Sequence, residues 1–198
     1  MKLYERLPDR VTVGRRRFKL RLDFRNVLKM IDTLAREDLL PEAREYLALR
    51  CVTRPRGDIH ALMTAVLALL FRPGEKSSEK IMDYAQDADL IRAAFLQSYG
   101  INLYRDKLHW FEFSALLASM PEGSRYSEIL SIRARPMPAP TKWNAEERAW
   151  LAQAKAQYAV KLTEKETENQ YQAGLRQMAA GLLKLAKQGG DDDGGRAG

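Results

Sequence analysis

The segment from Ile59 to Phe71 constrains the fold most strongly, because apolar residues occupy nearly every side of the helix that it predicts. A helix of this kind lies in the middle of a core and not at a protein surface. Asp58 can cap its N-terminus, and Pro73-Gly74 ends it. Other helices must surround this central one, so the sequence predicts a mainly α fold.

The surrounding helices are predicted from apolar residues that recur at helical spacing. Asp23 caps the first, and Pro41 opens the second at its first turn. Further helices are predicted over 81–99, with a break near residues 86–87, over about 107–119, and over about 126–132. In the second helix, we expect the buried face to consist of Ala43, Tyr46, Leu47 and Arg50.

A short β-hairpin is predicted from Val11 to Leu22, with its turn at Gly14. Beyond the turn, side chains alternate between two faces, as in a strand. One face is largely apolar and must be covered by the helical body; it consists of Arg16, Phe18, Leu20 and Leu22. The other face is basic and consists of Arg15, Arg17, Lys19 and Arg21.

Residues 136–140 contain three prolines and predict a stiff, extended linker. The linker separates a helical body with an N-terminal hairpin, residues 1–135, from a long helical arm, residues 141–188. We expect Thr141 to cap the arm. Residues 189–198 are rich in Gly and Asp, a composition typical of a disordered tail.

The arm carries large apolar side chains at helical spacing, namely Trp143, Trp150, Leu151 and Tyr158. Such anchors after a proline linker are typical of a helix that lies in a groove of a partner protein. The same side chains would also serve to pack the arm back onto its own body. The sequence leaves both interpretations open.

The chain contains no GxGxxG, Walker A, HExxH, paired CxxC or GxSxG motif. Cys51 is its only cysteine and there are two histidines, which leaves little material for a zinc site. We interpret His109 as a locally hydrogen-bonded residue and the acidic residues over 83–89 as helix caps. We therefore expect no catalytic activity, no metal and no cofactor.

The formal net charge is +7, and part of it lies on the basic hairpin face. This face is compatible with a solvated edge strand, with an acidic protein partner or with a phosphate backbone. No aromatic residue alternates with its cations, so base stacking is not supported and nucleic acid is the less favoured partner. No apolar run is long enough to predict a membrane span.

The region from Ile81 to Arg133 resembles a bacteriophage family called the gene-product-fifteen proteins. The resemblance rests on the stretches 81–84, 87–91, 93–101, 108–116 and 120–123, on Ile129 and Arg133, and on Leu7-Pro8 and 23–25 near the N-terminus. It covers most of residues 1–140. Its signature residues are Asp83, Tyr84, Asp87, Asp89, Phe95, Tyr99, His109, Trp110, Phe113 and Arg133.

The resemblance implies a non-catalytic role in the assembly of phage or prophage tails, as a tail assembly chaperone. Its partners would be the tape-measure protein, the tail tube protein or both, with self-association left open. The protein would act in the cytoplasm of the host bacterium and be absent from the mature virion. The alternatives are a nucleic-acid-binding phage protein that uses the basic hairpin face, and a structural component retained in the tail.

Overall fold

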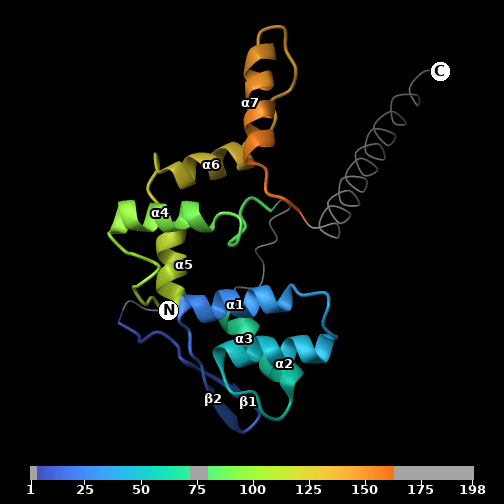
Figure 1. Cartoon of the computed structure of the whole chain (residues 1–198), viewed down its shortest axis with the longest axis vertical. Helices are drawn as coiled ribbons and strands as arrows, with labels where there is room; N and C mark the ends of the chain where they lie inside the picture. Colours follow the sequence, from blue (N-terminus) through green and yellow to red (C-terminus); the bar gives the residue numbers. More distant parts are fainter. Residues whose placement is uncertain (1–3, 72–79, 163–198) are drawn as a thin grey trace, which may run out of the picture.

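The computed structural model describes residues 4–71 and 80–162. In chain order its elements are β1 (Arg10–Val13), β2 (Arg16–Lys19), α1 (Phe24–Leu34), α2 (Pro41–Val52), α3 (Ile59–Leu70), α4 (Ala88–Tyr99), α5 (Trp110–Ala118), α6 (Arg125–Ala134) and α7 (Ala145–Tyr158). The predicted fold class is confirmed, because the described chain is mainly helical with a short antiparallel hairpin near its N-terminus. In Figure 1, the hairpin lies with α1, α2 and α3 at one end of the molecule, and α7 lies at the other.

The two strands of the hairpin pair with Val13 opposite Arg16 and Val11 opposite Phe18. The turn begins at Gly14, whose φ of 57° is readily adopted only by a residue without a side chain. The strand ends at Lys19, earlier than predicted, because the chain then turns onto the end of α2. There the N–H of Arg21 donates to the carbonyl of Val52 at 2.7 Å.

The central position of α3 agrees with its apolar sequence. It contacts α2 and β1, and its buried residues are Leu62, Met63, Val66 and Leu70. The predicted cap is also confirmed, since the Asp58 carboxylate accepts the N–H of Ala61 at 2.9 Å.

The predicted buried face of α2 is wrong. Tyr46 and Leu47 are 42% and 37% exposed, and Ala43 and Arg50 are exposed as well. The buried residues are instead Ala48, Leu49 and Val52, on the side that packs against α1 and α3. Both sides of this helix carry apolar residues, so the neighbouring helices and not the spacing decide which side is buried.

An aromatic cluster joins two groups of helices, which are α1, α2 and α3 beside the hairpin and α4, α5, α6 and α7 in the rest of the described chain. The ring of Phe113 on α5 stacks on Phe24 of α1, with ring centroids 4.7 Å apart, and on Phe95 of α4, at 5.2 Å. Trp110 and Tyr84 also pack against the Phe113 ring. Phe113 thus lies where α1, α4 and α5 meet.

The helix predicted over 81–99 begins only at Ala88. The carboxylate of Asp83 accepts the N–H groups of Ala85 and Gln86, both at 2.9 Å, and this holds the preceding residues in a turn. The predicted break near residues 86–87 is therefore the start of α4. The predicted end is confirmed, since Gly100 follows the helix with a φ of 68°.

The linker at 136–140 is not helical, and α7 follows it. The N-cap of α7 is Asn144 and not Thr141; the Asn144 side chain accepts the N–H of Thr141 at 2.9 Å and donates to the carbonyl of Ala139 at 2.8 Å. The helix ends at Tyr158, and residues 159–162 are not helical. The remainder of the predicted arm and the predicted disordered tail lie outside the described residues.

Candidate functional site

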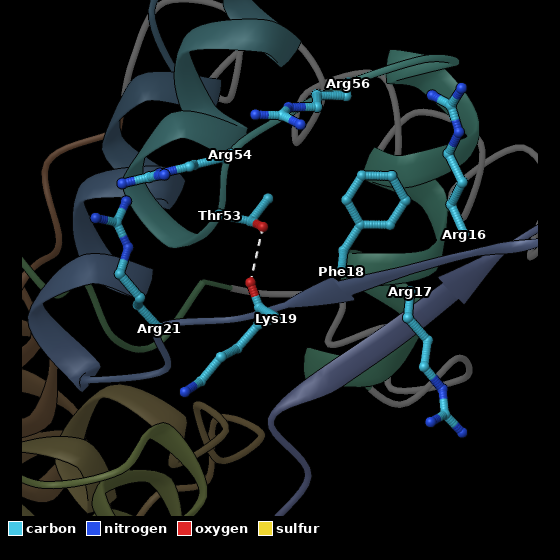
Figure 2. A pocket seen from close by; sticks show the side chains of 8 residues that line it. All are labelled: Arg16, Arg17, Phe18, Lys19, Arg21, Thr53, Arg54 and Arg56. Atoms are coloured by element: carbon cyan, nitrogen blue, oxygen red, sulfur yellow. Dashed lines mark hydrogen bonds between the residues drawn. The ribbon is translucent and has the colours of Figure 1, made fainter.

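A hollow of about 730 Å³ with a strongly basic lining lies between the hairpin and the loop that joins α2 to α3. We call it the basic hollow; its lining residues are Arg16, Arg17, Phe18, Lys19, Arg21, Thr53, Arg54 and Arg56 (Figure 2). A second hollow of about 440 Å³ shares three of these residues and adds Tyr46, Arg50 and Pro55. No aspartate or glutamate lines either hollow.

Hydrogen bonds between the hairpin and the end of α2 place the two sides of the basic hollow. The hydroxyl of Thr53 donates to the carbonyl of Lys19 at 2.8 Å (Figure 2). The guanidinium of Arg21 donates to the carbonyl of Arg50 at 2.7 Å, which satisfies a helix-end acceptor. These contacts hold the loop carrying Arg54 beside the strand.

Only part of the predicted basic hairpin face lines the basic hollow. Arg15 lies in the hairpin turn and does not line the basic hollow. In Figure 2, the side chains of Arg17 and Lys19 point away from the Phe18 ring, whereas Arg21 points toward the α2–α3 loop. The sequence prediction missed the other cations, which are Arg16, Arg50, Arg54 and Arg56.

The cations around the basic hollow are largely unneutralised. Among the contacts of residues 4–71 and 80–162, no hydrogen bond or ion pair involves the side chain of Arg16, Arg54 or Arg56. The Arg16 guanidinium lies close to the backbone of Gly57, where an added Cβ would be 3.0 Å from it. This surface can therefore attract a partner with negative charge.

The predicted anchors of the arm fall into two groups. Leu151 is fully buried, and Tyr158 is partly buried, with its hydroxyl bonded to Arg125 of α6. Trp143 and Trp150 are 94% and 55% exposed. Two of the four side chains thus pack toward the body, as the packing interpretation expects, and the other two face solvent.

Polar contacts fix the described part of the arm to the body. α7 packs against α6, and the ammonium of Lys155 donates to the carbonyl of Arg133 at 2.7 Å. Beyond the helix, Gln86 and Lys161 exchange two hydrogen bonds, of 2.7 and 2.8 Å. The two exposed tryptophans are consequently presented from an anchored element.

Two of the signature residues form a buried ion pair. Arg133 of α6 makes two bonds to the Asp87 carboxylate, of 2.8 and 2.9 Å, and the two side chains are 11% and 5% exposed. The same guanidinium donates to the carbonyls of Ile81, at 3.1 Å, and Tyr158, at 2.5 Å. Arg133 thus links α4, α6, α7 and the segment before α4. The sequence prediction named both residues but not their pairing.

The other signature residues also have structural contacts. The His109 ring accepts the N–H of Phe111 at 3.3 Å, and Glu112 accepts the N–H of His109 at 2.9 Å, which makes a capping box for α5. The hydroxyl of Tyr99 donates to the carbonyls of Leu116 and Ser119, at 2.8 and 2.9 Å. Asp89 is exposed and pairs with Arg92 at 2.8 Å.

Sequence reasoning missed a more apolar hollow of about 760 Å³ between α5, α6 and the segment before α4. Its lining includes Met82, Leu117, Met120 and Leu130. Desolvation by burial raises the pKa of Tyr126, which also lines this hollow, to about 12. Burial thus disfavours the phenolate form of Tyr126.

The part of the chain that the structure describes holds no group of three or more His, Cys, Asp or Glu side chains arranged to bind a metal ion. Within residues 4–71 and 80–162, no helix is both long enough and apolar enough to cross a bilayer.

A family model described as "Bacteriophage Gp15 protein" matches residues 3–160, which include every described helix and the hairpin. No curated protein and no solved structure matches the chain. The resemblance identified from the sequence is thereby confirmed. The chain belongs to the bacteriophage Gp15 protein family, which indicates a phage structural or assembly protein.

Proposed function

We propose that this chain is a non-catalytic tail assembly protein that acts as a chaperone for the tape-measure protein, the tail tube protein or both. The observation that carries the proposal is the exposed pair Trp143 and Trp150 on an arm anchored to the body. Tryptophan is enriched among the residues that dominate protein-protein binding energies. In this proposal the protein works in the host bacterial cytoplasm during assembly.

The arm offers a direct test. Replacing Trp143 and Trp150 together with alanine should weaken co-purification of the tail proteins at least about thirtyfold, because one tryptophan anchor that a partner buries contributes roughly 2 kcal/mol or more. The measurement is the amount of tape-measure or tube protein retained by a tagged chain after co-expression.

Tyr104 offers a matched control for the two tryptophans. Replacing Tyr104, which is 71% exposed on the loop before α5, removes an exposed aromatic ring away from α7. It should leave co-purification unchanged. Circular dichroism should show that the double tryptophan variant remains folded, since both side chains are exposed. Equal retention of tail proteins by this folded variant and by the wild type would exclude the tryptophan pair as the contact.

A chaperone is absent from the mature virion, whereas a retained tail component is present in it. We expect mass spectrometry of purified virions to detect tube and tape-measure peptides but no peptides of this chain. The same measurement on lysates taken before assembly is complete should detect the chain readily. Recovery from virions in a fixed ratio to the tube protein would instead identify a structural component.

A further inference from the structure

The basic hollow has a charge that its own fold does not balance. Six arginine or lysine residues and no aspartate or glutamate line it, although Arg17 and Lys19 direct their side chains away from the Phe18 ring. The side chains of Arg16, Arg54 and Arg56 make no hydrogen bond or ion pair to another described residue. Like charges that lie close together repel one another and raise the free energy of the folded protein. An anionic partner removes this repulsion. The unneutralised cations therefore indicate that the partner supplies the negative groups.

Acidic residues lie close to the basic surface. At the open end of the hairpin, beside Lys19, Asp9 pairs with Arg10 at 3.4 Å. Along α2, one helical turn before Tyr46 of the second hollow, lies Glu42, and Glu45 pairs with His60 at 3.0 Å. A nucleic acid duplex carries a phosphate charge about every 1.7 Å of its axis and favours a longer basic track. The nearby carboxylates would repel a long run of phosphates, which favours a short acidic segment as the occupant.

The surface also contains apolar contact area. Phe18 lines the basic hollow and is partly buried, and Tyr46, 42% exposed, lines the second hollow beside it. In Figure 2 the Phe18 ring lies between the side chains of Arg16 and Arg56. A guanidinium group can donate two parallel hydrogen bonds to one carboxylate. The exposed part of an aromatic ring can contact an apolar side chain.

We propose that the basic hollow is a docking site for a short acidic peptide segment of a partner protein, one in which aspartates or glutamates flank an apolar side chain. This inference rests on the proposed function, since it gives the chemistry by which a tail protein would be recognised. It adds a second contact surface beside the hairpin, which lies at the opposite end of the molecule from α7 (Figure 1).

The test measures binding of labelled probes to the full-length protein by fluorescence anisotropy. The probes are a peptide in which aspartates flank one phenylalanine, the same peptide with asparagines, and a thymidine oligonucleotide. We expect the aspartate peptide to bind most tightly. Replacing Arg54 and Arg56 with glutamine should weaken its binding about tenfold, because each substitution removes a charge-assisted hydrogen bond to a carboxylate of the peptide.

A charge-matched variant provides the control. Arg36 and Arg105 are exposed and lie outside both hollows, so replacing both with glutamine makes the same change in net charge and should leave binding unchanged. If both variants lose peptide binding to the same extent, the loss follows from net charge alone and the proposal is overturned. Tighter binding of the oligonucleotide than of the aspartate peptide would overturn it as well. Salt-sensitive self-association that the Arg54 and Arg56 substitutions abolish would assign the hollow to a second copy of the chain and would also overturn it.

The same variants separate this inference from the proposed function. If a chain with Arg54 and Arg56 replaced retains tail proteins as well as the wild type does, the docking site is wrong and the assembly function stands. If the wild type binds the aspartate peptide in the hollow but retains neither tail protein, the docking chemistry stands and the partner assignment is wrong.

Discussion

Replacing Arg133 with methionine is expected to lower the free energy of unfolding by about 3–5 kcal/mol. The substitution leaves the carboxylate of Asp87 buried without the guanidinium that contacts it at 2.8 and 2.9 Å. It also removes donors from the carbonyls of Ile81 and Tyr158. Because these contacts connect four segments of the chain, the loss should affect the whole group of α4, α6 and α7.

Urea denaturation followed by circular dichroism measures this effect. Arg135 supplies the control, since its ion pair with Glu147 is about half exposed, and its replacement by methionine should cost less than about 1 kcal/mol. Replacing Asp87 with asparagine in the Arg133 variant should recover part of the loss, because no unpaired buried charge remains. An Arg133 variant no less stable than the Arg135 variant would contradict the structural role of this ion pair.

Replacing Phe113 with alanine should lower the free energy of unfolding by about 3–5 kcal/mol, the usual cost of removing a buried aromatic ring from a core. Its ring is 1% exposed and packs against Phe24, Phe95, Trp110 and Tyr84. The cavity would open where helices from both groups meet, so little relaxation is available to fill it.

The same denaturation experiment checks the Phe113 prediction. Tyr104 has an exposed ring and provides a comparison. Its replacement by alanine should lower the free energy of unfolding by less than about 1 kcal/mol. A Phe113 variant that unfolds together with the Tyr104 variant would show that the aromatic cluster does not hold the two groups of helices together.

The sequence predicted the elements better than their faces and contacts. The caps at Asp23 and Asp58 and the end at Gly100 follow from local backbone chemistry, which neighbouring residues determine. The buried side of α2 was not predictable in the same way, because apolar residues occur on both sides and tertiary packing chooses between them. The sequence predicted helix at Asp83, but the structure has a turn there, because the Asp83 carboxylate accepts backbone N–H groups.

The candidate sites show the same division. Arg17, Lys19 and Arg21 were predicted, but Arg54 and Arg56 join them only because the α2–α3 loop lies beside the strand, a contact that no local pattern contains. The pairing of Asp87 with Arg133 spans 46 residues and was likewise outside the reach of periodicity. The exposure of Trp143 and Trp150 was left open by the sequence, because spacing does not say what a helix packs against.

Co-expression with the tape-measure protein of the same phage tests the proposed assembly function most directly. The measurement is the fraction of tape-measure protein in the soluble lysate and the amount retained by a tag on this chain. We expect the tape-measure protein to be largely insoluble alone, and to become soluble and co-purify when it is expressed with this chain. Equal solubility with and without the chain, together with no retention of tape-measure or tube protein, would contradict the proposed assembly function.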